Sequence, residues 1–163
     1  MTLVVADSAR VSPLADLEDS TRGTLIEIGE DVVVDAFVKI KPAGGVGDVR
    51  IGPRCVLNSG VVIYTGNGVT LGADVLLAAN VVLAPTNHEF AARNVPIREQ
   101  GFQPSRGGIV IEDDVWIGAG SVVLDGAVVR RGAVVGANSV VRDEVAPYSV
   151  AVGSPLRVVG RRG

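Results

Sequence analysis

The 163-residue sequence is 47% hydrophobic but only 4% aromatic, so Val, Ile, Leu and Ala must form its core. One cysteine, Cys55, excludes an intramolecular disulfide framework and a cysteine-rich metal site, and we expect this thiol in the core. The net charge of −3 divides into +4 over residues 127–163 and −7 over the rest, which favours an anionic ligand at the basic end over nucleic acid.

The first residues, MTLVVADSARVS, have no basic segment followed by a sustained apolar one, so they do not read as a secretory signal. No apolar run in the chain approaches the roughly 18–20 residues of a membrane span. We therefore expect a cytoplasmic protein without membrane insertion.

An aliphatic residue recurs every six positions along most of the chain. The eighteen such positions are all Ile, Leu or Val: Val5, Val11, Leu17, Ile28, Val34, Ile40, Ile51, Leu57, Ile63, Leu71, Leu77, Leu83, Ile111, Ile117, Val123, Val129, Val135 and Val141. The set from Val5 to Leu17 is the weakest. A period of six is neither the 3.6 of a helix nor the alternation of a hairpin.

A second position of the repeat, four residues after each aliphatic residue, is small or β-branched. Examples are Cys55, Val75, Ser121 and Ala133. We expect both positions to point inward. Glycine directly follows the aliphatic residue at five turns, where we expect a positive φ or a close backbone approach: Gly29, Gly52, Gly72, Gly118 and Gly136.

Extra residues interrupt the repeat only after Leu17, Ile40, Ile63 and Leu83. Insertions at one place per eighteen residues indicate a three-sided coil with all its loops at one corner. Coils stacked at ~4.8 Å would give about six coils and a prism roughly 29 Å long. We thus expect one all-β domain over 1–163, with coils over about 5–145, a protruding loop over 87–108 and a short C-terminal segment over 146–163.

The loop at 87–108 is the longest interruption, and it contains Pro96, Pro104 and several glycines. Loops of this length in compact domains are usually functional. The only histidine of the chain, His88, lies at its start. An imidazole there can accept a proton from a hydroxyl or an amine, or it can simply cap backbone groups of the loop. Its neighbour Glu89 could orient the ring or face solvent.

The pattern [LIV]-G-x-x-[small]-x, strongest over residues 107–160, resembles that of the hexapeptide-repeat acyltransferases. Within that superfamily the sequence is most similar to the galactoside/maltose-type and surface-polysaccharide O-acetyltransferases. The resemblance implies a left-handed parallel β-helix, although the general crossover rule favours the right hand. One departure is Glu112, which stands where the family usually has glycine.

The resemblance also implies a reaction and a donor. Thr86-Asn87-His88 matches the T-x-H motif whose histidine is the general base, and the implied donor is acetyl-coenzyme A, with no metal. Gly153, Pro155 and Arg157 match a G-x-P-x-[KR] motif. The residues implied to bind the coenzyme fall into three groups. They are Trp116, which we expect to point outward; the small residues that would line a narrow slot for the pantetheine arm, Gly118, Ala119, Gly136 and Ala137; and the arginines of the basic end, Arg142, Arg157 and Arg161.

Three asparagines are candidates for the acceptor site: Asn58, Asn80 and Asn87. Asn80 follows an apolar run, and we expect it in a strand, where its amide either joins a side-chain ladder or lines the site. Arm residues such as Arg93, Arg98, Gln103 and Arg106 could meet an acidic acceptor or remain solvated. The resemblance further implies a homotrimer with its active sites between subunits, and a sugar or sugar-nucleotide acceptor.

Four functions are weighed on these residues. Transfer to a hydroxyl of a sugar or surface-polysaccharide precursor is favoured, because the chain shows no helical N-terminal region like that of serine acetyltransferases. Transfer to a nucleotide-linked amino sugar needs the same base and stays open. A β-helical carbonic anhydrase needs three zinc-binding histidines and is excluded by one. A non-catalytic solenoid scaffold would show regular Thr ladders, which this sequence lacks.

Overall fold

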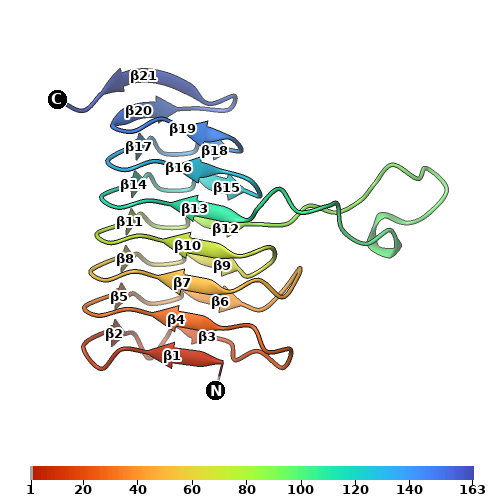
Figure 1. Ribbon diagram of the computed structural model, residues 1–163, viewed down its shortest axis with the longest axis horizontal. Helices are drawn as coiled ribbons and strands as arrows, with labels where there is room; N and C mark the ends of the chain where they lie inside the picture. Colours follow the sequence, from red (N-terminus) through yellow and green to blue (C-terminus); the bar gives the residue numbers. More distant parts are fainter. Residues whose placement is uncertain (1) are drawn as a thin grey trace.

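The computed structural model describes residues 2–163, and three sheets wind into one prism (Figure 1). The first sheet contains β1 (Leu3–Val5), β4 (Ile26–Ile28), β7 (Val49–Ile51), β10 (Val69–Leu71), β13 (Ile109–Ile111), β16 (Val128–Val129) and β19 (Glu144–Val145). The second contains β2 (Arg10–Val11), β5 (Val33–Val34), β8 (Val56–Leu57), β11 (Leu76–Leu77), β14 (Trp116–Ile117), β17 (Val134–Val135), β20 (Ser149–Val152) and β21 (Arg157–Arg161). The third contains β3 (Asp16–Leu17), β6 (Lys39–Lys41), β9 (Val62–Tyr64), β12 (Val82–Ala84), β15 (Val122–Leu124) and β18 (Val140–Val141).

Each coil takes one strand from each sheet in turn, and every strand pair but one is parallel. Six complete coils run from β1 to β18, and β19 and β20 begin a seventh. In Figure 1 the chain crosses the front sheet from right to left while it climbs from the N-terminus to the C-terminus, which makes the coil left-handed. The coil count confirms the prediction of about six.

The core consists of the two repeat positions predicted to point inward. All fifteen aliphatic positions from Ile28 to Val141 are at most 2% exposed, as are the small and β-branched residues four positions on. Burial raises the pKa of the Cys55 thiol to about 11, so this group is an unreactive part of the core. Val5 and Val11 are 38% and 36% exposed, because they lie in the first coil and, within residues 2–163, no coil packs against its outer side.

The structure decides between the two reasons for glycine, a positive φ or a close approach, that the sequence analysis left open at the tight turns. A Cβ on Gly52 would lie 2.4 Å from the carbonyl oxygen of Gly72, so glycine is required there by close approach. The positive φ falls elsewhere, three residues after the inward aliphatic residue, at Arg54 (57°), Asp74 (60°) and Asn80 (59°). Asn80 is therefore a turn residue, and the expectation that it lies in a strand was wrong.

Glu112, the departure from the family pattern, leaves its turn intact. Its carboxylate accepts hydrogen bonds from the Arg130 guanidinium (2.9 Å) and from the backbone N–H of Arg131 (2.7 Å). The positive φ of the turn stays at Asp114 (56°). An ion pair to the next coil thus stabilises a turn that glycine stabilises elsewhere.

Glu112→Gln should destabilise the protein near neutral pH, by no more than about 1 kcal/mol because the pair is partly exposed. The hydrogen bond from Arg130, and then that from Arg131, lowers the pKa of this carboxyl from its ordinary 4.5. A lowered folded pKa gives stability that is present above pH 4.5 and is lost as pH falls through the folded pKa. The melting temperatures of the wild-type protein and Glu112→Gln should therefore differ at neutral pH and converge in acid. A difference that persists in acid would contradict this assignment.

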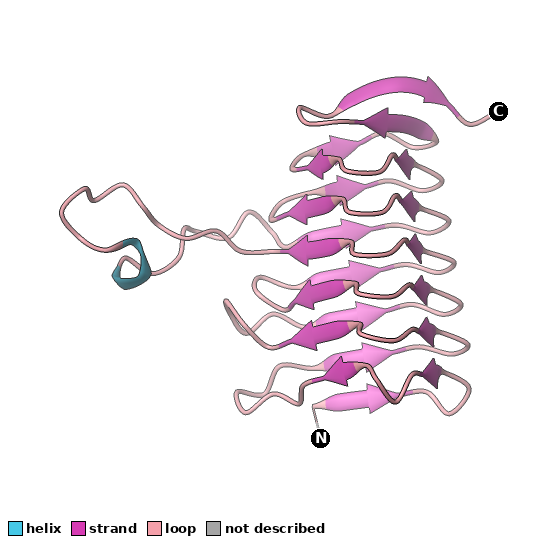
Figure 2. Ribbon diagram, turned by 180° about the vertical axis from the view of Figure 1, so that it is seen from behind, coloured by secondary structure: helices cyan, strands magenta, loops and turns pink. Residues whose placement is uncertain are grey.

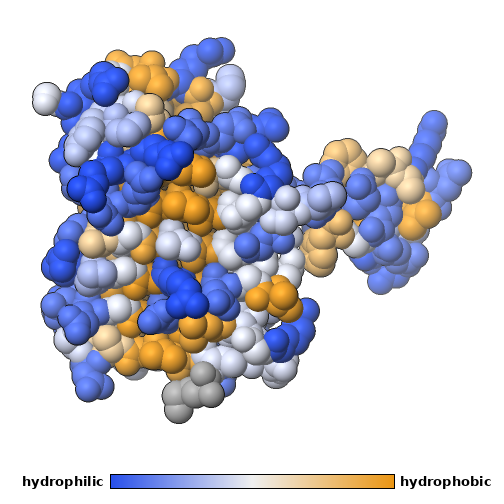
Figure 3. Space-filling model, in the orientation of Figure 1, coloured by the Kyte–Doolittle hydropathy of each residue, from blue (hydrophilic) through white to orange (hydrophobic). Residues whose placement is uncertain are grey.

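The chain leaves the prism once, between β12 and β13, as an arm seen from both sides in Figures 1 and 2. The arm carries the short 3-10 segment η1 (Ile97–Glu99). Apolar surface on the arm is visible in Figure 3, and Phe90 and Phe102 are 64% and 51% exposed. Within residues 2–163, no helix has the length and apolarity needed to cross a membrane.

The C-terminal segment forms more than the short tail that we expected. Strand β20 continues the second sheet, and β21 turns back and pairs with it antiparallel, covering that end of the sheet (Figure 2). The N-terminal and C-terminal ends of the prism therefore differ. The first ends in an open coil, and the second ends in a hairpin that carries Arg157 and Arg161.

Candidate active site

The segment after β12 places the only histidine at the edge between the third and first sheets. The hydroxyl of Thr86 donates to the carbonyl oxygen of Gly44 (3.1 Å), which lies in the loop between β6 and β7, two coils earlier. Gly44 has a φ of 80°, and a Cβ there would lie 2.7 Å from Cγ2 of Thr86. The chain is thus fixed against the prism two residues before His88.

His88 lies in the two-stranded base of the arm, where it forms an antiparallel bridge with Phe102. The N–H of Glu89 donates to the carbonyl of Gly101 (3.0 Å), and the N–H of Gln103 donates to the carbonyl of Asn87 (2.8 Å). The rings of His88 and Phe102 have centroids 4.8 Å apart at 36°. The imidazole is exposed, yet its backbone is held on both sides.

A hollow of about 390 Å³ lies beside this imidazole. It is lined by Ala43, Gly44, Tyr64, Ala84, Thr86, His88 and Phe102. Its walls are mostly apolar and aromatic, and His88 contributes the one imidazole among them. A hydroxyl placed in this hollow could pass its proton to the ring.

The hydrogen bonds found for the Glu89 carboxylate go to the arm backbone and not to the imidazole. This carboxylate accepts hydrogen bonds from the backbone N–H groups of Phe90 (2.8 Å) and Ala91 (2.9 Å). These two bonds, that of Ala91 first, lower the pKa of the Glu89 carboxyl. This side chain stabilises the arm instead of orienting His88.

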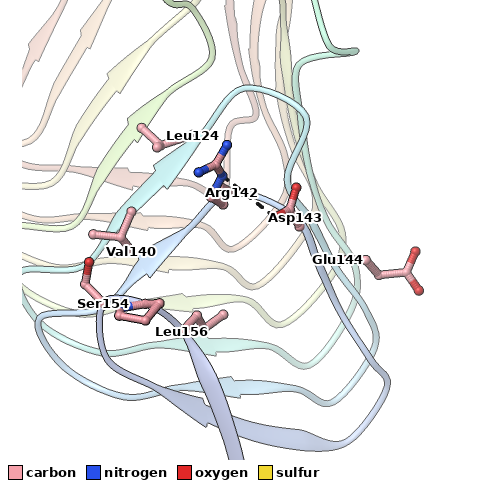
Figure 4. A pocket seen from close by; sticks show the side chains of 8 residues that line it. Leu124, Val140, Arg142, Asp143, Glu144, Ser154 and Leu156 are labelled. Atoms are coloured by element: carbon pink, nitrogen blue, oxygen red, sulfur yellow. Dashed lines mark ion pairs between the residues drawn. The ribbon is translucent and has the colours of Figure 1, made fainter.

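A second hollow, of about 470 Å³, lies on the same sheet near the C-terminus (Figure 4). It is lined by Leu124, Val140, Arg142, Asp143, Glu144, Ser154, Pro155 and Leu156. Leu124 pairs directly with Ala84 of the histidine hollow, so one strand spacing separates the two hollows. Arg142 is 71% exposed, and its nearest carboxylate is that of Asp143 at 3.7 Å, which leaves its charge available to an anion.

Two stretches of the sequence match families of hexapeptide-repeat transferases. Residues 108–143 match the bacterial transferase hexapeptide (six repeats), and residues 48–85 match the hexapeptide repeat of succinyl-transferase. A Schizosaccharomyces pombe protein named as an acetyltransferase is 33% identical over 158 residues, covering 90% of this chain and 73% of that protein. This chain belongs to the hexapeptide-repeat acyltransferases.

Other relatives of this acyltransferase are longer. A Mycobacterium tuberculosis protein named as an acetyltransferase is 36% identical over 116 residues, which are 71% of this chain and 38% of that protein. Galactoside O-acetyltransferase of Escherichia coli is 34% identical over 112 residues, 69% of this chain and 53% of that enzyme. Among solved structures, a variant of the Bacillus cereus N-acyltransferase AntD, in complex with dTDP-4-amino-4,6-dideoxyglucose and coenzyme A, has a TM-score of 0.81. It is 22% identical, and the match covers 99% of this chain and 84% of that one, which shows a shared fold.

Most of the predicted site residues of this acyltransferase fall on two different edges of the prism. Asn87, His88 and Arg142 follow strands of the third sheet, at its edge with the first. Six more lie at turns between the second and third sheets: Asn58, Asn80, Gly118, Ala119, Gly136 and Ala137. The remaining three, Trp116, Arg157 and Arg161, lie on strands of the second sheet. The third sheet separates the two edge groups within one chain.

At the second edge, the observed contacts are with the prism itself. The amide of Asn58 donates to the carbonyl of Leu77 in the next coil (2.9 Å), and Asn80 is an exposed turn residue. A Cβ on Gly118 would lie 2.5 Å from the nitrogen of Ala137, so this edge is closely packed. Ala119 and Ala137 are exposed beside it.

Trp116 points outward from the second sheet, as predicted, and is 49% exposed between Leu76 and Val134 of the neighbouring strands. Arg157 and Arg161 are exposed on β21. Within residues 2–163, no group of three or more His, Cys, Asp or Glu side chains is arranged to hold a metal ion.

The sequence analysis missed the aromatic walls of the histidine hollow, Tyr64 and Phe102. Tyr64 is the last residue of β9 and points outward at the loop corner, one step after the inward Ile63. Its position in the repeat could have indicated this. Phe102 contacts His88 only because the arm folds back on itself, and nothing in the repeat indicates that fold.

Proposed function

We propose that this chain transfers the acetyl group of acetyl-coenzyme A to a hydroxyl of a sugar or surface-polysaccharide precursor. The observation that carries the proposal is the exposed imidazole of His88, held over an aromatic-walled hollow one strand from a second hollow with an available arginine. The names of the relatives, galactoside O-acetyltransferase among them, support the same reaction.

In the proposed step, the oxygen of the acceptor hydroxyl attacks the thioester carbonyl while His88 takes the proton of that hydroxyl. Backbone N–H groups would hold the oxyanion. The tetrahedral intermediate collapses as the carbon–sulfur bond breaks, and the imidazolium returns the proton to the leaving thiolate. The products are an acetyl ester and free coenzyme A. Asn87, next to His88, is proposed to bind the acceptor together with Asn58 and Asn80 from the facing edge of a neighbouring subunit.

The division of site residues between two edges supports a trimer with its active sites between subunits. In that arrangement, the edge with Gly118, Ala119, Gly136 and Ala137 of one prism would face the His88 edge of the next. Trp116 would then reach the coenzyme, and the exposed apolar side chains of the arm would be covered. Light scattering should give the mass of three chains. We place the reaction in the cytoplasm, where acetyl-coenzyme A is available.

A thiol-release assay with acetyl-coenzyme A tests this function. Free sugars, amino sugars and nucleotide-linked amino sugars should be compared as acceptors, because the same base can serve a hydroxyl or an amine. We expect release that depends on an acceptor with a free hydroxyl. Release with amino sugars alone would replace O-transfer with N-transfer, and no release with any acceptor would refute both.

Arg157→Ala should raise the KM for acetyl-coenzyme A about tenfold and change kcat little. The reason is that an exposed arginine paired with a coenzyme phosphate contributes binding to both the ground state and the transition state. Steady-state kinetics with the donor varied give this value. Arg22→Ala, which removes an exposed arginine at the opposite end of the prism, is the matched control. A rise in the acceptor KM alone would show that the donor site is misplaced.

A further inference from the structure

A buried carboxylate holds the root of the arm. Asp125, in the turn after β15, is only 1% exposed. It accepts three hydrogen bonds: from the backbone N–H of Arg106 (2.8 Å), from that of Gly108 (2.9 Å) and from the amide of Asn67 (3.1 Å). We call these four residues the root cluster. Because all three donors point at one buried group, the returning limb of the arm is fixed at this point.

The side chain of Arg106 extends this attachment across the next coil. Its guanidinium donates to the carbonyls of Asp125 and Arg142 (both 3.2 Å) and pairs with the carboxylate of Asp143 at 2.9 Å. It lies over Gly126, where an added Cβ would be 2.7 Å from the Cβ of Arg106. A planar guanidinium offers five N–H donors on three nitrogens in a fixed fork, whereas a lysine offers three donors on a single nitrogen.

The root cluster also contacts the outgoing limb. The backbone N–H of Asn67 donates to the carbonyl of Pro85 (2.9 Å), three residues before His88, while its side chain binds Asp125. On the returning limb, Pro104 has a fixed φ and lies between Phe102 and Arg106. The position of Arg106 is thus transmitted over a short, stiff segment to the ring that packs on His88.

We propose that Arg106 is a positioning residue for His88, which it places through the returning limb of the arm. This inference rests on the proposed function, since it assigns Arg106 a part in acetyl transfer without contact with the reacting atoms. Arg142 and Asp143, which Arg106 contacts, line the C-terminal hollow (Figure 4), so the arm and that hollow share one set of contacts. As long as these contacts of Arg106 are intact, the imidazole keeps a fixed position over the hollow beside it.

Arg106→Ala should reduce kcat by about 10–100-fold, because small displacements of a catalytic group are costly, while the KM for acetyl-coenzyme A changes little. The backbone N–H that binds Asp125 remains, so the variant should fold. Added ethylguanidine should restore part of the kcat of Arg106→Ala by refilling the site. The kcat of Arg106→Lys should fall between those of the wild-type protein and Arg106→Ala. Arg22→Ala is the matched control, since Arg22 is an exposed arginine in the loop between β3 and β4, with no proposed part in the site.

Hydrogen exchange gives a readout that does not depend on activity. In Arg106→Ala, the amides of Glu89 and Gln103, which form the base of the arm, should lose protection. An unchanged kcat, a change in coenzyme KM alone, or a loss of kcat without rescue would overturn the proposal. If the wild-type protein transfers no acetyl group, the proposed function fails, and exchange alone then decides whether Arg106 positions the arm: unchanged protection overturns that too.

Discussion

His88→Ala should reduce acetyl transfer by roughly 10²–10⁴-fold and leave the fold intact. The loss is large because the acceptor oxygen would have to attack the thioester without a group to take its proton. The fold should persist because the imidazole is exposed and packs on Phe102 in the arm, outside the core of the prism. The measurement is kcat/KM by thiol release, with melting temperature and mass determined on the same samples.

His88→Gln is the matched variant for this prediction. It retains a polar side chain of similar size that can donate and accept hydrogen bonds but cannot accept a proton at neutral pH. Loss of activity equal to that of His88→Ala would assign the effect to proton transfer. Turnover that survives in both variants would remove His88 from the mechanism.

Asp125→Ala should destabilise the protein by about 2–4 kcal/mol, the largest effect on stability that we expect from a polar residue. The substitution leaves the N–H groups of Arg106 and Gly108 and the amide of Asn67 buried without an acceptor. Urea unfolding measures the change. Asp125→Asn should be intermediate, because it keeps one carbonyl oxygen but turns an NH₂ group toward a donor.

Asp143→Ala is the control for Asp125. Its carboxylate is 68% exposed and pairs with Arg106, and such exposed pairs contribute about 0–1 kcal/mol. Both substitutions remove one negative charge near the same arginine, so a difference between them isolates burial and hydrogen bonding. Equal stability of the two variants would mean that the root cluster does not hold the arm as described.

The prism could be predicted because one physical constraint acts on every coil. Each inward position, such as Leu57 or Val75, packs against its equivalent in the next coil, so the period of six is written along the chain. The handedness could not be derived in this way, since the same inward pattern suits either hand. Nor could the turn geometry: the positive φ is tolerated at Arg54, Asp74 and Asn80, and no single residue type marks it.

The candidate site was predictable only in part. His88 could be found because it is the one histidine and lies where the repeat stops. Asp125 gave no such signal, since an Asp-Gly pair at a turn is ordinary and its partners come from two other loops. Arg106 was assigned to the arm, but its contacts with the body of the prism depend on how the arm returns.

The most direct test of the account is the chemical nature of the product. Wild-type protein should be incubated with acetyl-coenzyme A and an acceptor that carries both a hydroxyl and an amine, and the acetylated product should be treated with mild alkali. The account predicts an ester that alkali removes and that His88→Ala does not form. An alkali-stable amide, or a product formed equally by the His88 variant, would contradict it.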